Sequence, residues 1–193
     1  MSEDVVTETG VRARTRRAIL DAAIETLTKQ PGASLADIAA AANVGRTTVH
    51  RYFPERSDLI DAISLDALDK ISQGTEKARL QDGPAHTALA RLCQEYFEFG
   101  DVFQLLFTMP DLVTRPEWQE ESDDDRVLLR LIERGHAEGT IDPAMTKEWL
   151  LQLLWSLLYT AWELVREKTP KHEALTLCLR SLEKVVVADR VPK

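Results

Sequence analysis

Five polar side chains lie close together between residues 46 and 51, around one valine. They are Arg46, Thr47, Thr48, His50 and Arg51. Guanidinium, hydroxyl and imidazole groups donate hydrogen bonds to base edges and to phosphates, and Arg can grip a guanine through two bonds at once. On a helix, Val49 would face inward while these polar groups face outward. The chemistry that this segment favours is therefore recognition of a nucleic acid.

Two short helices joined by a tight turn are predicted to position these side chains. The first follows Ser34, a good N-cap, with Asp37 as its capping partner. The turn is Asn43-Val44-Gly45, where Asn tolerates a left-handed backbone, and the second helix covers 46–53. Small residues lie where the helices would cross, and apolar residues would anchor them: Ala39, Ala40, Ala41 and Ala42, then Ile38, Val44 and Val49. With a preceding helix over 12–29, this pattern predicts a helix-turn-helix at 34–53.

Helical periodicity also dominates the rest of the chain, and no segment shows a convincing strand alternation. We therefore expect an all-α fold of about nine helices. The fourth is expected over 57–73, capped by Ser57 and ended at Gly74. The eighth and ninth are expected near 146–166 and 172–188.

The distribution of charge supports a nucleic-acid partner, although the total charge does not. The chain has 193 residues, a net charge of −8 and a pI of about 5.1. An even spread of that charge would disfavour binding to phosphates. Residues 12–57 nevertheless hold eight basic and four acidic side chains, a net +4, which leaves −12 for the remainder. Four of the basic residues open the first helix, where they oppose its dipole unless a polyanion is bound: Arg12, Arg14, Arg16 and Arg17.

Over about residues 12–60 the sequence resembles the TetR-type (tetracycline-repressor-like) transcriptional regulators. Four stretches carry the resemblance: RAILDAA at 17–23, SLADIA at 34–39, ANVGRTTVHRYF at 42–53 and RSDL at 56–59. Asn43, Gly45, His50 and Arg56 depart from the residues usual in the family at these positions. Beyond residue 60 the resemblance is architectural, in length, helix count and a long apolar penultimate helix.

The resemblance implies a role for each residue of the motif. Arg46, Thr47 and Thr48 would face base edges in the major groove. His50, Tyr52, Arg56 and the Ser34 cap would meet phosphates, with Tyr52 open to a packing role instead. With Arg51, these form the expected DNA-binding set. The implied division is a flexible arm at 1–11, a DNA-binding domain at 12–57 and an effector-binding and dimerisation domain at 58–193.

The resemblance implies that the larger domain binds a small effector, and the aromatic residues that recur along it favour a mostly hydrophobic or aromatic one. The candidate lining is Tyr96, Phe99, Phe103, Phe107, Met109, Trp118, Trp155, Tyr159 and Trp162, each of which could also be ordinary core. Six carboxylates lie close together at Glu117, Glu120, Glu121, Asp123, Asp124 and Asp125. A solvated loop or helix start explains them better than a metal site, and no metal or cofactor is expected.

One apolar run suggests a partner chain. In residues 149–165, 13 of 17 residues are apolar or aromatic, which is short of the ~20 that a membrane span needs. A helix that is apolar on nearly every side must be buried on two fronts, so a homodimer is expected and no membrane. The candidate interface is Trp155, Leu158, Trp162, Leu175, Leu179, Leu182 and Val186. Two copies would place two recognition helices on a near-palindromic double-stranded DNA operator.

The function indicated is a cytoplasmic, homodimeric DNA-binding repressor released from its operator by a small molecule. The main alternative is a helical ligand-sensing or partner-binding protein without DNA function. An enzyme is disfavoured, because the chain lacks a phosphate-binding glycine loop, a zinc-protease motif and a nucleophile elbow. Cys93 and Cys178, the two cysteines, are far apart in sequence and indicate reduced core thiols.

Overall fold

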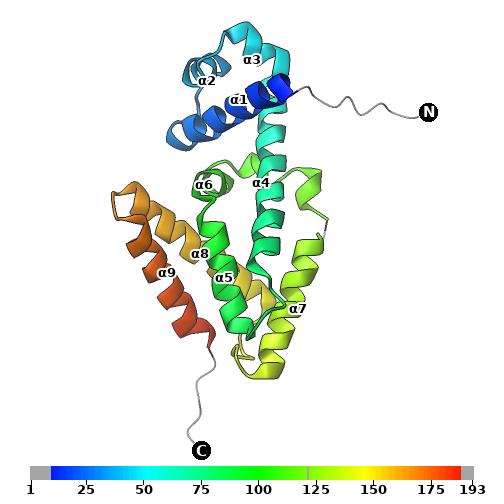
Figure 1. Cartoon of the computed structure of the whole chain (residues 1–193), viewed down its shortest axis with the longest axis vertical. Coiled ribbons are helices and arrows are strands. Elements are labelled where there is room, and N and C mark those ends of the chain that lie inside the picture. Colours follow the sequence, from blue (N-terminus) through cyan, green and yellow to red (C-terminus); the bar gives the residue numbers. More distant parts are fainter. Residues whose placement is uncertain (1–9, 121, 188–193) are drawn as a thin grey trace, which may run out of the picture.

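The computed structural model describes residues 10–120 and 122–187, and within them it contains nine α-helices and no strand (Figure 1). The helices are α1 (Gly10–Lys29), α2 (Leu35–Ala41), α3 (Arg46–Tyr52), α4 (Arg56–Ala78), α5 (Ala85–Phe97), α6 (Gly100–Thr108), α7 (Asp123–Glu138), α8 (Lys147–Arg166) and α9 (Lys171–Val186). Two short 3-10 turns, η1 (Pro110–Leu112) and η2 (Pro116–Trp118), precede α7. The predicted all-α fold is confirmed. Of the expected arm, Gly10 and Val11 belong to α1, and the rest lies outside the described residues.

The first three helices, which we call the head, pack around one apolar cluster. Ile19 and Leu27 of α1, Ile38 of α2, Val49 of α3 and Phe53 just after α3 are at most 1% exposed. Helices α2 and α3 have seven residues each, which is too short for a helix to be stable alone in water. Helix α2 therefore depends on its packing against α1, and α3 on its packing against α2.

Helix α4 starts earlier and runs further than the sequence suggested. It begins at Arg56 after Glu55, and the Glu55 and Asp58 side chains each accept a hydrogen bond from the other's backbone N–H. It continues through Gly74 to Ala78, so the expected span of 57–73 with a Ser57 cap is wrong. A Cβ at position 74 would lie 2.8 Å from Cδ1 of Tyr96 on α5. Gly74 therefore permits a close helix crossing and does not end the helix.

Helices α4–α9, which we call the body, enclose a second core. Helix α5 packs against α4, α7, α8 and α9, while α8 and α9 form a hairpin on one side (Figure 1). Helix α7 starts with a capping box between Ser122 and Asp125 and ends at Gly139, whose φ of 65° is left-handed. Within the described segments, none of the helices, α8 included, is long and apolar enough to cross a membrane.

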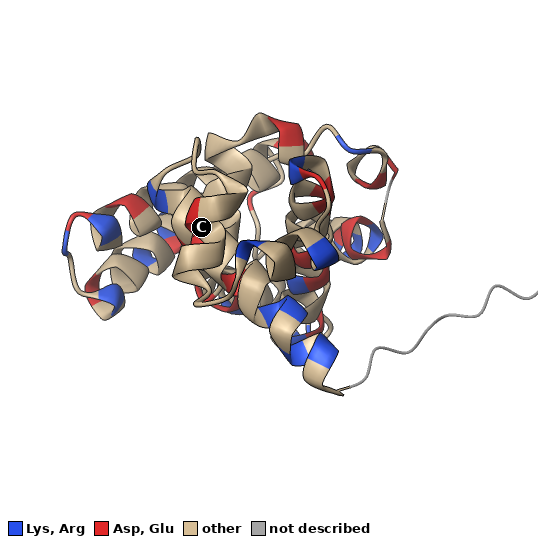
Figure 2. Ribbon diagram, turned by 90° about the horizontal axis from the view of Figure 1, so that it is seen from above, with Lys and Arg blue, Asp and Glu red and all other residues tan. Residues whose placement is uncertain are grey.

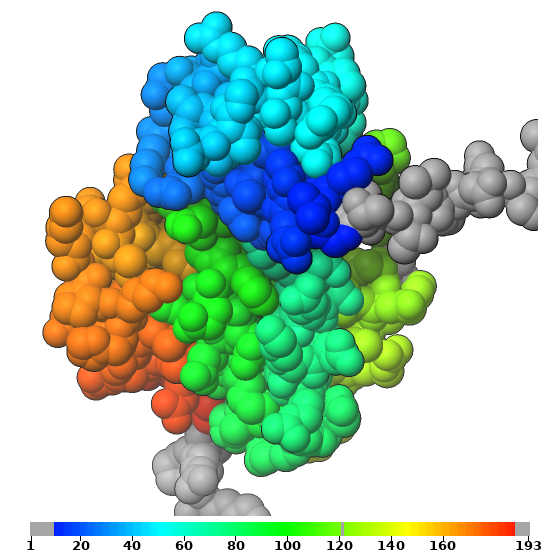
Figure 3. Space-filling view, turned by 45° about the horizontal axis from the view of Figure 1, so that its top comes forward, coloured from blue at the N-terminus to red at the C-terminus, as the bar shows by residue number. Residues whose placement is uncertain are grey.

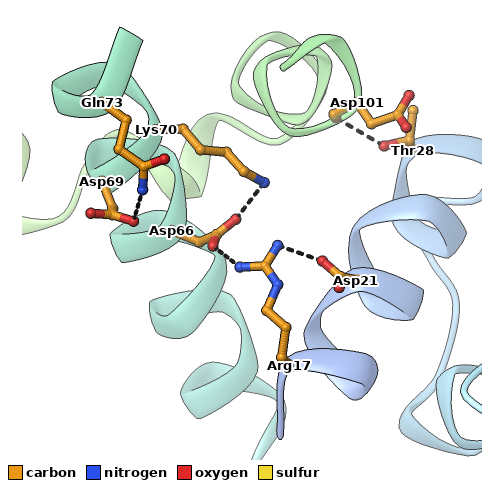
Figure 4. A network of polar contacts seen from close by, with 8 residues as sticks. All are labelled: Arg17, Asp21, Thr28, Asp66, Asp69, Lys70, Gln73 and Asp101. Carbon is orange, nitrogen blue, oxygen red and sulfur yellow. Dashed lines mark hydrogen bonds and ion pairs between the residues drawn. The ribbon is translucent and has the colours of Figure 1, made fainter. Parts of the chain in front are cut away.

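The head rests on the body through α1, which packs against α6 and α4 and lies directly on the green and blue-green residues in Figure 3. Arg17 of α1 pairs with Asp66 of α4 and with its own neighbour Asp21 (Figure 4). Lys70 adds a second cation to Asp66, with Nζ 2.8 Å from Oδ2. Near the C-terminal end of α1, the Thr28 hydroxyl donates to the carbonyl of Asp101 on α6 at 3.2 Å. The orientation of the head is therefore held at two points along α1.

We predict that Asp66→Asn will lower the free energy of unfolding by about 2 kcal/mol, as measured by urea denaturation. The Asp66 side chain is only 7% exposed and accepts bonds from two cations, so the neutral amide would leave both poorly compensated. Asp69→Asn is the matched control, because Asp69 lies one turn away on the exposed face of α4 and bonds only to Gln73 in Figure 4. Equal losses in the two variants would contradict a structural role for the Asp66 contacts.

Candidate nucleic-acid interface and internal cavity

The turn between α2 and α3 sets the angle of α3. Asn43 has φ = 53°, the left-handed conformation expected for it, and the N–H of Val44 bonds to the carbonyl of Ala39 at 3.0 Å. Gly45 then takes an extended backbone as N-cap of α3. No side chain caps α3, and a Cβ at Gly45 would lie in ordinary contact with the hydroxyls of Thr47 and Thr48, at 3.7 and 3.8 Å.

Helix α3 has one buried face and one polar exposed face. Val49 is fully buried against the head, whereas Arg46, Thr47, His50 and Arg51 are exposed and Thr48 is half-buried. The Arg51 guanidinium lies 5.3 Å from the centroid of the Tyr52 ring, a cation–π contact that holds its stem against the helix. Guanidinium, hydroxyl and imidazole groups thus project from a single rigid helix, as the sequence predicted.

Three residues expected at phosphates already have partners within the head. Arg56 donates to the carbonyl of Ala33 and, at 2.8 Å, to that of Pro31, and so it fixes the loop between α1 and α2. The Ser34 hydroxyl donates to Oδ2 of Asp37 at 2.7 Å and caps α2. Nδ1 of His50 lies 3.3 Å from the carbonyl of Pro54. These contacts give Arg56 and Ser34 a structural role whatever else they bind.

Basic residues lie close together along the start of α1, beside the point where the described chain begins (Figure 2). Arg12 and Arg14 are exposed, and no acidic residue lies in the first turn of this helix. Arg16 lies over the Phe53 ring, 5.2 Å from its centroid, close to the end of α3. The start of α1 and the polar face of α3 therefore belong to one positively charged head.

A cavity of about 250 Å³ lies inside the body, between α4, α5, η2, α7 and α8. Apolar, aromatic and acidic side chains share its lining: Leu68, Ile71, Tyr96, Glu117, Trp118, Glu120, Ser122, Asp124, Asp125, Leu128, Leu151, Leu154 and Trp155. Tyr96 and Trp155 stack with ring centroids 5.4 Å apart and an angle of 11°. Flat aromatic walls of this kind favour a flat aromatic ligand.

Two hydrogen bonds connect this cavity directly to α4. The Tyr96 hydroxyl and the Thr75 hydroxyl are 2.9 Å apart, and Nε1 of Trp118 donates to the Ser64 hydroxyl at 2.8 Å. Ser64 and Thr75 are both buried residues of α4, the helix that follows directly from the head. A change in the position of either ring would therefore act on α4.

The acidic run contributes to the cavity as well as to the start of α7. Burial raises the pKa of the Asp124 carboxyl, its hydrogen bonds to Ser72 and Thr75 lower it, and the neighbouring Asp125 and Asp123 raise it, with a net increase. Asp123 points away and pairs with Arg126. Glu121 lies outside the described residues. Within those that are described, no group of three or more metal-binding side chains is arranged to hold an ion.

The nine aromatic and sulfur-containing residues expected at a pocket are divided between several places. Tyr96, Trp118 and Trp155 line the cavity. The Phe103 ring packs against Trp155 in an edge-to-face arrangement, with the ring centroids 5.4 Å apart. The other five do not line this cavity: Phe99, Phe107, Met109, Tyr159 and Trp162. Trp162 instead borders a hollow of about 450 Å³ between α1, α6, α8 and α9, where Lys29, Asp101 and Arg166 make the walls more charged. The aliphatic residues of the smaller cavity were missed, because core leucines carry no sequence signal of a ligand.

The residues expected at a dimer interface are likewise divided. Leu158, Trp162, Leu182 and Val186 are at most 5% exposed and belong to the core of the chain itself, while Trp155, Leu175 and Leu179 are half-buried. Other apolar side chains of the hairpin remain outside: Trp149 is 59% exposed, Leu177 51% and Val185 39%. The exposed surface of α8 and α9 therefore includes apolar side chains that the sequence analysis did not select, among polar ones such as Gln152 and Arg180.

Comparison with known proteins places these features in a family. The model of the "Bacterial regulatory proteins, tetR family" matches residues 19–63. The HTH-type transcriptional repressor LfrR of Mycolicibacterium smegmatis is 34% identical over 181 residues, covering 93% of this chain and 94% of LfrR.

Solved structures agree. The crystal structure of LfrR from Mycobacterium smegmatis in complex with proflavine matches with a TM-score of 0.70 at 32% identity, covering 91% of this chain and 98% of that one. KstR2 of Mycobacterium tuberculosis, a ketosteroid transcriptional regulator, shares the fold with a TM-score of 0.73 at 13% identity, covering 95% of this chain and 98% of that one. The exposed polar helix of the head and the identity to LfrR along nearly the whole chain lead to one conclusion: the protein belongs to the tetR family of bacterial regulatory proteins and is a DNA-binding transcriptional regulator.

Proposed function

We propose that the protein is a homodimeric repressor that leaves its operator when a small aromatic cation binds in the body. The observation that carries the DNA-binding part is α3, whose polar groups project from a helix held rigid by the buried Val49. Residues 12–57 would form the DNA-binding unit and residues 58–193 the effector-binding and dimerisation unit.

On DNA, the beginning of α3 would enter the major groove. Arg46 and Thr47 are exposed at this end and would contact base edges, together with the half-buried Thr48. His50, Arg51 and Tyr52 lie further along and would contact the backbone, with Arg12 and Arg14 close by on the same head. Arg56 and Ser34 would contribute mainly by holding α2 and its preceding loop in place.

We predict that Arg46→Ala will lose about 1–3 kcal/mol of discrimination against a changed base pair at one position of each half-site. The operator is first obtained by selecting bound fragments from random DNA, and affinities are then measured by fluorescence anisotropy. Arg130→Ala, an exposed arginine on α7 remote from the head, is the control and should change nothing. The wild-type affinity should also fall steeply between 50 and 200 mM salt, by about a thousandfold for six phosphate contacts. An affinity that does not depend on salt would contradict the proposed phosphate contacts. An Arg46→Ala variant with unchanged base preference would contradict the proposed role of Arg46.

The effector class follows from the cavity. Tyr96, Trp155 and Trp118 offer flat apolar surface, while Asp124, Asp125, Glu117 and Glu120 add negative charge around it. A planar aromatic ligand that carries a positive charge satisfies both, which adds a charge to the hydrophobic or aromatic effector expected from the sequence. The proflavine complex of LfrR supports this choice, because proflavine is such a compound.

Release from DNA would follow from the bonds between the cavity and α4. A ligand seated against Tyr96 and Trp118 would act on the hydroxyls of Thr75 and Ser64, and therefore on the helix that leads into the head. It would favour release only if it bound more tightly to the conformation with displaced heads. The contacts of Arg17 with Asp66 would transmit a displacement of α4 to α1.

We predict that Asp124→Asn will weaken proflavine binding at least about tenfold, measured by fluorescence titration, because a hydrogen bond or ion pair with a charged group is lost. Asp123→Asn is the matched control, since Asp123 lies in the same helical turn, is exposed and pairs with Arg126.

Because the raised pKa of Asp124 makes its carboxyl take up a proton at a higher pH than usual, wild-type affinity for proflavine should fall as the pH decreases toward that pKa. The Asn variant should lack this component. If both variants bind proflavine equally well, Asp124 does not hold the cation.

The dimer would form through the hairpin of α8 and α9. The exposed side chains of Trp149, Leu177 and Val185 add apolar surface to the outside of this hairpin, and a two-fold axis would pair it with its copy. A four-helix interface of this kind would hold the two α3 helices at a fixed distance, which a near-palindromic operator requires.

We predict that Leu177→Asp will convert the dimer to a monomer in sedimentation equilibrium at micromolar concentration, because a charge would be buried at the centre of the interface. Leu65→Asp is the control. Leu65 is 52% exposed on α4, against 51% for Leu177, but lies outside the proposed interface. A dimer that survives Leu177→Asp, or one broken equally by Leu65→Asp, would contradict this assembly.

A further inference from the structure

The two cysteines, 85 residues apart in sequence, lie against each other in the core of the body. Sγ of Cys93 on α5 and Sγ of Cys178 on α9 are 3.5 Å apart, within hydrogen-bonding distance for thiols. Cys93 is fully buried and Cys178 is 4% exposed, and both are free thiols. The sequence indicated core thiols but gave no sign of their contact.

The pairing follows from the packing of α5 on α9. Ala174, Cys178 and Leu182 recur every four residues and form one buried face of α9. On α5, Leu89, Leu92 and Cys93 form the opposing buried face. Each thiol therefore projects from a helix whose buried face packs against the other helix, and this packing brings the two sulfur atoms together.

We propose that Cys93 and Cys178 are a thiol–disulfide site at which a hydroperoxide closes an internal disulfide between α5 and α9. The thiolate of Cys178 attacks the peroxide, the O–O bond breaks, and a sulfenic acid forms as hydroxide or alcohol leaves. Cys93 then attacks the sulfenic sulfur, and water leaves with the thiol proton. In total, two thiols and one peroxide give one disulfide and two hydroxylic products. A small dithiol would restore both thiols by exchange.

The environment of each sulfur supports this order of events. The hydrogen bond with Cys178 and then burial raise the pKa of the Cys93 thiol. At Cys178 the hydrogen bond with Cys93 lowers the pKa by more than burial raises it. The thiolate is the reactive form, so Cys178 is the first nucleophile and Cys93 the resolving thiol. Cys178 is also the more exposed of the two, and hydrogen peroxide is scarcely larger than water.

The disulfide would affect the cavity through α5. A disulfide bond measures about 2.05 Å, so the sulfur atoms must approach by about 1.5 Å from their present 3.5 Å. Tyr96 lies one turn after Cys93 on the same helix, where it stacks on Trp155 and bonds to Thr75 of α4. We therefore infer that oxidation shifts Tyr96 and changes effector affinity. This consequence rests on the proposed effector function, whereas the disulfide itself does not.

The test for the disulfide uses the full-length reduced protein and hydrogen peroxide. We expect the native chain to lose the mass of two hydrogen atoms and both titratable thiols, and a peptide map to join Cys93 to Cys178. The thermal midpoint should rise by about 5 °C and return after dithiothreitol. Cys93→Ser and Cys178→Ser should each form no internal link. Thiols that persist in the native protein while the urea-unfolded chain oxidises, or a link formed only between two chains, would overturn the proposal.

The test for the coupling compares proflavine affinity before and after oxidation. We expect at least a threefold change in the wild type and none in the Cys93→Ser, Cys178→Ser double variant, which keeps the body folded with isosteric side chains. A disulfide that forms without any change in affinity would overturn the coupling and leave the oxidation site standing. If proflavine binds to neither redox form, the proposed effector fails, while the mass and peptide measurements still decide the disulfide.

Discussion

A seven-residue helix is not stable alone in water, and this constraint determines how the head is built. Helix α3 owes its position to Val49, which is fully buried against the apolar face of α1 and α2. Because only this face of α3 is buried, its other faces are exposed to solvent, and the polar side chains project from them. Asn43 contributes the left-handed turn that aims the helix, and Arg56 fixes the loop that precedes α2. The exposed polar face of α3 therefore depends on the burial of Val49 on the opposite face of the same helix.

Helix α4 connects the recognition surface to everything else, since it is the one covalent path from head to body. Along its length it contacts α1 through Asp66, η1 and Trp118 through Ser64, and Tyr96 through Thr75. Three of its buried polar side chains, Ser64, Asp66 and Thr75, thus lie where α4 contacts another element. Buried polar groups cost free energy unless they are paired. A displacement of α4 that breaks one of these hydrogen bonds or ion pairs therefore costs free energy and tends to disturb the others. Helix α4 therefore contacts both the head and the cavity, so DNA and effector would have opposite effects on its position.

Local sequence patterns predicted the head well and the cavity only in part. The Ser34 and Asp37 capping pair, Asn43 and the anchors Ile38 and Val49 act over a few residues, so their spacing is visible in the chain. The end of α4 was misplaced at Gly74, because the reason for that glycine is Tyr96, which comes 22 residues later. The contact of Cys93 with Cys178 and the inward turn of Asp124 also arise from helix packing between distant segments. Such pairings carry no local signal, and a single sequence does not reveal them.

The uneven charge of the chain is explained by the same separation of functions. Residues 12–57 carry +4 and the remainder −12. Part of that negative charge opens α7, where Asp123, Asp124 and Asp125 stabilise the helix N-terminus through its dipole. The turn of the helix then sends neighbouring carboxylates in different directions, so Asp123 meets Arg126 at the surface while Asp124 reaches the cavity. One acidic run therefore both caps a helix and lines the cavity. The −8 of the whole chain hides this separation, because the negative charge lies outside residues 12–57 and the head keeps a net positive charge.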